Sequence, residues 1–168
     1  EGNKAYINLG NRRFAEVSSC LGIAETNWSW GLDFVDFDND GDLDFFVVNG
    51  FSLSGSTNED AHNDSPDRLF RNVRAECTEG SLSGTPCEPI DDCLLARGLL
   101  NPSVGTRRLS RYVEVGGELG FNSTRSSKSA IAFDADSDGD MDVIVCHSVG
   151  PCTAYLNTIG SSSGHVLR

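Results

Sequence analysis

The sequence predicts an all-β fold built from small antiparallel sheets. Gly occurs 18 times in 168 residues and Met once, a composition that suits short strands joined by turns. The apolar stretches are short, and turn residues bound each of them. A unit of 36 residues also recurs, because residues 14–49 align with residues 112–147 at an offset of 98 without a gap.

The repeat extends beyond a short motif. Thirteen of its 36 aligned pairs are identical, and six of these lie in DFDNDGDLD (36–44) and DADSDGDMD (134–142). Other identities lie outside these stretches: Glu16/Glu114, Val17/Val115, Leu21/Leu119 and Gly22/Gly120. The repeat is therefore expected to be a structural unit.

Each unit is predicted to contain four short strands. An apolar strand, the Asp-rich loop and a second apolar strand come first. A strand with two large apolar residues before Asn follows, as in YINLG (6–10), LFRNV (69–73) and YLNTI (155–159), and then a strand with the pattern aromatic-x-Glu-Val. This order indicates an antiparallel sheet. Helical periodicity is weak, and residues 91–100 are left open as a short helix or a loop.

The two Asp-rich loops predict Ca²⁺ sites. Oxygen ligands at alternate positions of a tight loop suit a hard cation, and a Gly at the sixth position lets the chain turn sharply. The position-seven residues Asp42 and Asp140 are expected to contribute backbone carbonyls. The predicted side-chain ligands are Asp36, Asp38, Asp40 and Asp44 in the first loop and Asp134, Asp136, Asp138 and Asp142 in the second.

Other interpretations of the loops fit less well. An EF-hand needs Glu at loop position 12, where this chain has Val47 and Val145, and it needs helices where the flanks here resemble strands. A solvated acidic turn would leave four or five carboxylates repelling one another, twice over. Zinc or copper would call for softer ligands than oxygen alone.

The first unit resembles a known repeat. WGLDFVDFDNDGDLDFFVVNG followed by DRLFRN is similar to the FG-GAP/VCBS repeat, the blade of integrin-alpha-type β-propellers, and to its cartilage-acidic-protein-like subgroup. The resemblance covers roughly residues 5–50, 67–73 and 112–159. It implies four-stranded blades around a central axis, with a Ca²⁺ loop joining the first two strands of each blade.

On this basis the chain is one propeller segment of about two blade equivalents. Closure of a propeller needs at least four blades, so the chain is expected either to be a fragment of a longer propeller or to be completed by other chains or copies of itself. The expected parts are 1–28, the end of one blade; 29–73 with 111–117, a full blade; 74–110, a Cys-rich insertion; 126–159, a partial blade; and 160–168, a flexible tail. The first unit carries a further polar insertion at 51–66.

Composition predicts an extracellular or cell-surface protein. The net charge of −12 argues against nucleic acid, and the absence of an apolar run of about 18 residues argues against a membrane span. The chain lacks an initiator Met and begins as a processed segment would. An even number of cysteines suits an oxidising compartment. The sequons begin at Asn27, Asn63 and Asn122, and the disulfide candidates are Cys20, Cys77, Cys87, Cys93, Cys146 and Cys152.

Two pairings are suggested by position. Cys146 and Cys152 enclose a five-residue turn and could cross-link a hairpin, and Cys20 is a candidate partner for one cysteine of the insertion.

No catalytic arrangement stands out. The G-x-S-x-G match at 160–164 lies in a linker-like tail, and the three histidines are scattered. The expected function is non-enzymatic: an adhesion or scaffold module, or a structural component of an extracellular assembly, stabilised by two Ca²⁺ ions. The alternative is a carbohydrate-binding (lectin) or polysaccharide-active propeller with glycans as partners. Trp28 and Trp30 could form a sugar platform, although core packing of Trp30 is the favoured interpretation.

Overall fold

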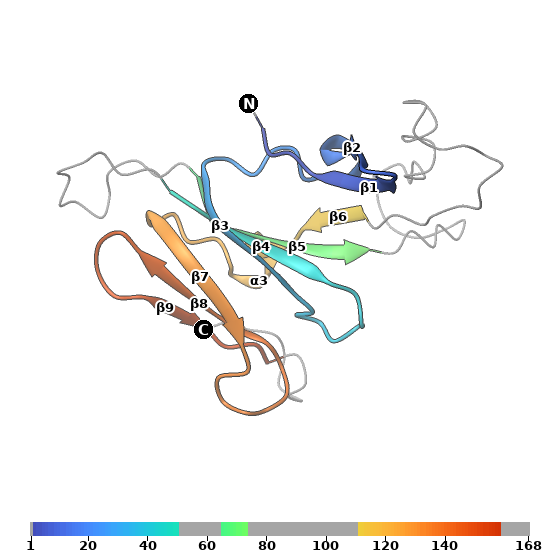
Figure 1. Cartoon of the computed structure of the whole chain (residues 1–168). Helices are drawn as coiled ribbons and strands as arrows, with labels where there is room; N and C mark the ends of the chain where they lie inside the picture. Colours follow the sequence, from blue (N-terminus) through green and yellow to red (C-terminus); the bar gives the residue numbers. More distant parts are fainter. Residues whose placement is uncertain (1, 51–64, 74–110, 159–168) are drawn as a thin grey trace. The chain divides into compact units, whose positions relative to one another are not determined.

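The computed structural model describes residues 2–50, 65–73 and 111–158, and these residues form antiparallel sheets with two short helices (Figure 1). The predicted all-β fold of propeller-blade sheets is confirmed. The tail at 160–168, the whole insertion at 74–110 with its residues 91–100, and most of the insertion at 51–66 lie outside the described ranges. The chain divides into two compact units, residues 1–25 with 72–113 and residues 26–71 with 114–168.

The N-terminal part of the first compact unit contains a β-hairpin and a single helical turn. β1 (Tyr6–Gly10) pairs with β2 (Arg13–Glu16) across Asn11 and Arg12, whose φ values of 51° and 60° suit a tight two-residue hairpin turn. α1 (Ser18–Leu21) follows β2 directly. A small core of Ala15, Val17 and Cys20 holds the hairpin and the helix together.

Two sheets carry the rest of the described chain, each a meander of strands in sequence order. The first has the order β3 (Ser29–Val35), β4 (Asp44–Asn49), β5 (Arg68–Val73) and β6 (Arg111–Glu114). The second has the order β7 (Ser127–Phe133), β8 (Asp142–His147) and β9 (Thr153–Tyr155). The first sheet has the predicted order of strand, Asp loop, strand and Asn-containing strand. The second sheet has the same order, except that Asn157 lies two residues after β9 ends at Tyr155.

An apolar core joins these two sheets in the second compact unit. Phe121, in the segment before β7, is almost fully buried and lies with its ring centroid 6.0 Å from Phe46 and 4.8 Å from Tyr155. The buried members of this core are Val35, Phe37, Phe46, Val48, Leu69, Phe121, Val143, Val145 and Tyr155. The core therefore lies directly against the strands that flank both Asp loops.

The short helices explain the repeat identities outside the loops. α3 (Gly116–Leu119) is the repeat counterpart of α1, and the sequence pattern did not predict either helix. Glu114 Oε1 accepts a hydrogen bond from Gly116 N at 2.8 Å, as Glu16 Oε1 does from Ser18 N at 2.8 Å. Gly120 ends α3 with φ of 81°, a left-handed value that favours glycine, as Gly22 does for α1 at 80°.

β3 and β7 each carry a β-bulge at the same repeat position. The register shifts between Ser29 and Gly31 in β3 and between Ser127 and Ser129 in β7, so Trp30 and Lys128 are the extra residues. A Cβ added to Gly31 would lie 3.0 Å from Val48 Cγ2 and 3.6 Å from Ser129 Cα. Glycine therefore lets β3 and β7 approach closely beside the bulges.

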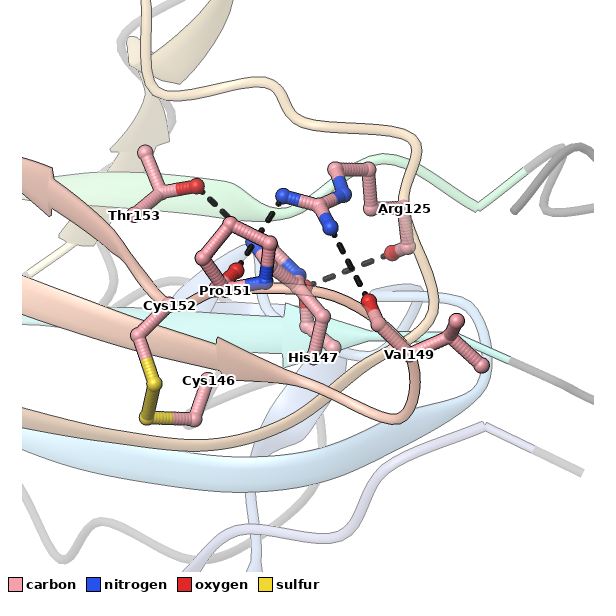
Figure 2. The surroundings of a disulfide bond; sticks show 8 residues. Arg125, Cys146, His147, Val149, Pro151, Cys152 and Thr153 are labelled. Carbon is pink, nitrogen blue, oxygen red and sulfur yellow. Dashed lines mark hydrogen bonds between the residues drawn. A yellow bond between two sulfur atoms is a disulfide. The ribbon is translucent and has the colours of Figure 1, made fainter.

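A disulfide links Cys146 at the end of β8 to Cys152 just before β9, as predicted (Figure 2). Arg125 fastens the same turn, because its guanidinium donates to Val149 O at 2.9 Å and to Pro151 O at 3.3 Å. Cys20 is also disulfide-bonded. Cys77, Cys87 and Cys93 lie outside the described residues, and the pairing proposed for them stays a prediction.

Candidate metal centre

The two Asp-rich stretches form the loops between β3 and β4 and between β7 and β8. β3 ends at Val35 and β4 begins at Asp44, so the first eight residues of DFDNDGDLD form the loop and the last aspartate begins a strand. β7 ends at Phe133 and β8 begins at Asp142, which gives the second loop the same placement. Both loops therefore turn at the end of a hairpin, as predicted.

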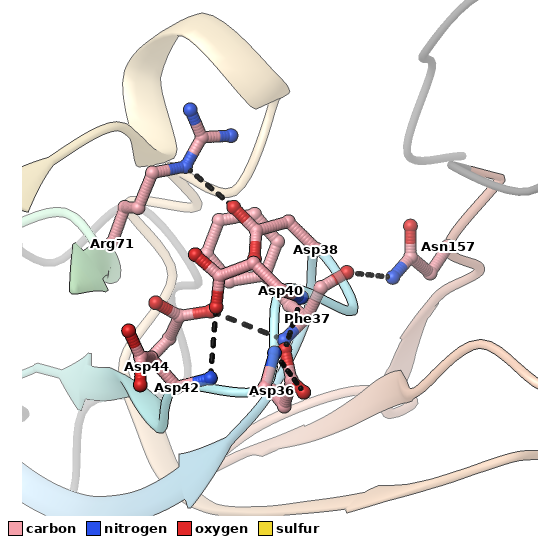
Figure 3. A network of polar contacts seen from close by, with 9 residues as sticks. Asp36, Phe37, Asp38, Asp40, Asp42, Asp44, Arg71 and Asn157 are labelled. Carbon is pink, nitrogen blue, oxygen red and sulfur yellow. Dashed lines mark hydrogen bonds and ion pairs between the residues drawn. The ribbon is translucent and has the colours of Figure 1, made fainter. Parts of the chain in front are cut away.

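The first loop is folded around its own carboxylates (Figure 3). Asp36 accepts hydrogen bonds from Asp40 N at 3.1 Å and from Gly41 N at 3.0 Å. Asp40 Oδ1 accepts from Asp42 N at 2.8 Å. These bonds hold the first position of the loop against the fifth and sixth, and the fifth against the seventh.

The second loop repeats this network. Asp134 accepts from Asp138 N and Gly139 N, each at 3.1 Å, and Asp138 Oδ1 accepts from Asp140 N at 2.9 Å. The backbone repeats as well, because the fourth and sixth positions are left-handed in both loops. The φ values are 58° for Asn39, 87° for Gly41, 64° for Ser137 and 96° for Gly139.

Each loop brings three predicted ligands into one cluster. In the first loop, carboxylate oxygens of Asp36, Asp38 and Asp40 all lie within 4.8 Å of one another, and the second loop has the same arrangement. Asp38 Oδ1 is buried and has no hydrogen-bond partner among the described residues. A buried, unpartnered carboxylate oxygen within a cluster of oxygens fits a hard cation such as Ca²⁺. The second cluster is Asp134, Asp136 and Asp138.

The ninth-position aspartates have a different setting. Asp44 is fully buried, and its Oδ2 accepts from Phe37 N at 3.1 Å. Asp142 Oδ2 accepts from Ala135 N at 2.8 Å, and its Oδ1 accepts from Asn157 N at 2.7 Å. Both residues brace the second position of their loops, and neither belongs to the three-carboxylate clusters.

Desolvation, together with neighbouring carboxylates, raises the pKa of the aspartate at the third position of each loop. The pKa of Asp38 is raised by burial and by the nearby charges of Asp40 and Asp36, although Arg71 acts in the opposite direction. The pKa of Asp136 is raised by desolvation and by its neighbours Asp138 and Asp142. A bound cation would reverse this effect, because it favours the ionised carboxylate.

Arg71 contacts the first Asp loop, and the sequence pattern did not predict this contact. Its Nε lies 2.9 Å from Asp38 Oδ2 in an ion pair, and its guanidinium carbon lies 5.5 Å from the centroid of the Phe37 ring (Figure 3). Arg71 lies in the LFRNV stretch, whose recurring feature is its Asn, so the sequence motif includes Arg71 without indicating its role.

Two asparagines connect the loops to each other. Asn157 Nδ2 donates to Phe37 O at 2.6 Å in a buried hydrogen bond, and its backbone N donates to Asp142. Asn39 Nδ2 donates to Asp140 Oδ1 at 2.6 Å. Asn157 thus joins Phe37 of the first loop to Asp142 of the second loop. Asn39 of the first loop is joined directly to Asp140 of the second. These contacts give the recurring Asn after β9 a physical role.

A separate polar network lies at the opposite end of β3, β4 and β7. Asp67 is buried and accepts from Asn49 N at 2.7 Å and from Ser127 Oγ at 2.8 Å. His147 lies 3.1 Å from the same Ser127 Oγ and 2.9 Å from Thr153 Oγ1. Ser127 is fully buried and donates to a carboxylate, so its hydroxyl is not presented to solvent as a nucleophile. Burial raises the pKa of Asp67 to about 6.

The expected packing of Trp30 in the core is not observed. Trp30 is 53% exposed and lies outside the apolar core. Its indole N–H donates to Gly50 O, and Lys128 Nζ lies 3.8 Å from its ring centroid, so the two bulge residues contact each other. Trp28 is 56% exposed. Asn27 and Asn122 are exposed, as glycosylation would require, and Asn63 lies outside the described residues.

Comparison with known families supports the resemblance of the first unit. Residues 1–47 match the FG-GAP-like repeat family, a range that contains β1, β2, β3 and the first Asp loop. FG-GAP repeats form the blades of β-propellers, so this match agrees with the observed sheets. The second copy of the repeat, residues 112–147, lies beyond the matched range. The internal repeat and the shared loop conformation relate it to the first copy. A search of curated proteins finds no match to the chain.

The described residues contain no helix long and apolar enough to cross a membrane.

Proposed function

We propose that this chain is a Ca²⁺-binding β-propeller module with one ion in each Asp loop. The single observation that carries the proposal is the pair of three-carboxylate clusters, held in the same backbone conformation by the same hydrogen bonds. One such loop could be an acidic turn, but two loops that point the same oxygens inward indicate a common ligand. The all-oxygen donor set favours Ca²⁺ over softer metals.

When bound, the ion would supply positive charge that offsets the repulsion within each cluster. Asp36, Asp38 and Asp40 would hold it in the first loop, and Asp134, Asp136 and Asp138 in the second. The hydrogen bonds from the loop amides orient these carboxylates in advance. Because Ca²⁺ would bind the folded chain and not the unfolded chain, it would stabilise the folded chain against unfolding.

Thermal unfolding with and without chelator tests this role. At millimolar Ca²⁺ we expect a melting temperature on the order of 5–10 °C above that in excess EDTA. A quadruple variant (Asp36→Asn, Asp38→Asn, Asp134→Asn and Asp136→Asn) should melt at the same temperature in both buffers. An unchanged wild-type melt in EDTA would show that neither loop holds a stabilising ion.

We further propose an extracellular setting, with a non-enzymatic role in adhesion, scaffolding or an extracellular assembly. The Cys146–Cys152 disulfide and the disulfide-bonded Cys20 suit an oxidising compartment. Extracellular modules bind Ca²⁺ at roughly 10⁻⁴–10⁻³ M, a range that such exposed loops suit.

Other chains or further copies of this chain are the proposed partners. Trp30, Leu32 and Phe34 alternate along β3 and are each more than half exposed, so one face of this strand presents apolar area to solvent. Such a face is available to pack against another sheet.

Carbohydrate binding is the second candidate, and the exposure of Trp28 favours it. An exposed indole can stack on the apolar face of a sugar ring. On a glycan array, Trp28→Ala should abolish saturable, Ca²⁺-dependent binding, while Phe14→Ala, at an exposed aromatic of the first compact unit, should leave it unchanged. An array without signal for the wild type would remove this candidate and leave the scaffold function.

A further inference from the structure

We propose that Arg71 makes the first Asp loop the weaker of the two Ca²⁺ sites by holding a fixed positive charge against Asp38. The inference rests on the proposed Ca²⁺ function and adds an affinity-determining residue to it. Two loops with the same carboxylates and the same backbone would then bind the same ion with different strength.

Strand register identifies the residue that occupies the place of Arg71 in the second unit. Phe45 in β4 pairs with Phe70 in β5, and Val143 in β8 pairs with Tyr155 in β9. Phe45 and Val143 are 98 residues apart, which is the offset of the repeat. Tyr155 is therefore the counterpart of Phe70, and the next residue, Leu156, is the counterpart of Arg71. The second loop has an uncharged side chain at this position.

The position of Arg71 is fixed by two contacts. Its Nε forms the 2.9 Å ion pair with Asp38 Oδ2, and its guanidinium lies over the Phe37 ring. The Asp38 side chain is 15% exposed and that of Arg71 is 39% exposed, so bulk water only partly screens the pair. The counterpart of Phe37 is Ala135, which offers no ring. Within the described ranges, no Lys or Arg pairs with Asp134, Asp136 or Asp138.

The charge difference sets the direction of the effect. Both loops contain five aspartates, but Arg71 offsets one negative charge at the first loop alone. Arg71 binds Asp38 Oδ2 and leaves the unpartnered Oδ1 for a cation, so the ion can still be ligated in its presence. Even at the dielectric constant of bulk water, a single charge about 6 Å from a divalent ion weakens binding by about tenfold.

An opposite effect of Arg71 is physically reasonable and makes the inference testable. By orienting Asp38 in advance, the ion pair could strengthen Ca²⁺ binding instead, as outer partners of metal ligands can do. Removal of Arg71 distinguishes the two cases by the sign of the change in affinity.

The experiment uses Ca²⁺ titration calorimetry on the full chain with one loop disabled at a time. With the second loop disabled by Asp136→Asn and Asp138→Asn, Arg71→Leu should bind Ca²⁺ about tenfold more tightly, whereas Arg71→Lys should stay within about threefold of the parent. With the first loop disabled by Asp38→Asn and Asp40→Asn, Leu156→Arg should weaken the second site. The Arg71→Leu gain should shrink between about 20 mM and about 500 mM salt.

The outcomes separate the two proposals. If neither loop of the wild type binds Ca²⁺, the proposed function fails and this inference with it. If both loops bind but Arg71→Leu leaves the first site unchanged or weakens it, only the role given to Arg71 is wrong. Circular dichroism establishes that each variant is folded, and should Arg71→Leu not fold, an unchanged affinity in Leu156→Arg would overturn the inference.

Discussion

Asp67 is a buried carboxyl group held by hydrogen bonds from Asn49 N and Ser127 Oγ. Burial raises its pKa in the folded state from the ordinary 3.8 to about 6, so the folded chain binds the proton more tightly than the unfolded chain does. Stability from this group is therefore fully present below about pH 4 and is lost as the pH rises through 6.

Asp67→Asn should remove this pH dependence while keeping the shape of the side chain. Between pH 3.5 and pH 7, the free energy of unfolding of the variant should gain roughly 3 kcal/mol relative to the wild type. Urea titrations of the variant and the wild type at each pH, in EDTA, measure the difference. Asp33→Asn, at an exposed position of β3, is the control. Parallel pH curves for Asp67→Asn and the wild type would mean that Asp67 does not titrate in this range.

Among the elements, the two hairpin loops depend on each other through Asn157. Its side chain donates to the carbonyl of Phe37, and its backbone amide donates to Asp142, so one residue after β9 braces both loops. Asn157→Ala would leave the buried Phe37 carbonyl without this donor.

We expect Asn157→Ala to lower the free energy of unfolding by about 1–3 kcal/mol, measured by urea denaturation in EDTA. The same substitution at exposed Asn122 should change it by less than about 0.5 kcal/mol. Because Asn157 holds the backbone of the first loop without being a predicted ligand, Asn157→Ala should also weaken Ca²⁺ binding at the first loop. A loss equal to that of Asn122→Ala would contradict a structural role for the Phe37 contact.

At the scale of the whole molecule, the exposed face of β3 bears on the proposed assembly. If Trp30, Leu32 and Phe34 meet another sheet, replacing Leu32 and Phe34 together by Lys should shift the chain toward monomer in sedimentation velocity. Asp33→Lys, on the same strand but the opposite face, is the matched control and should leave the distribution unchanged. A wild type that sediments as a monomer at high concentration would argue against self-assembly through this face.

Sequence reasoning went furthest where local pattern decides structure. The alternation of aspartates, the Gly at the sixth position and the apolar flanks were enough to place two loops at the ends of two hairpins. The Asn-containing stretches marked β1 and β5, whereas β9 ends at Tyr155, two residues before Asn157. The helices α1 and α3 escaped this reasoning because a four-residue helix has too few turns to show periodicity. The repeated Glu before each helix and the repeated Gly after it can be read from the sequence. The structure shows what they do: each Glu accepts a hydrogen bond from the first turn, and each Gly ends its helix in a left-handed conformation.

By itself, the sequence determined the repeat, the strand order, the Asp clusters and the Cys146–Cys152 pairing, because each depends on residues close together in the chain. The tertiary structure decided what depends on distant residues: Arg71 against Asp38, Asn157 against Phe37, and Ser127 against Asp67. It also decided that Trp30 stays half exposed beside Lys128. Such contacts join positions 33 to 120 residues apart, and their chemistry is set by which strands lie side by side.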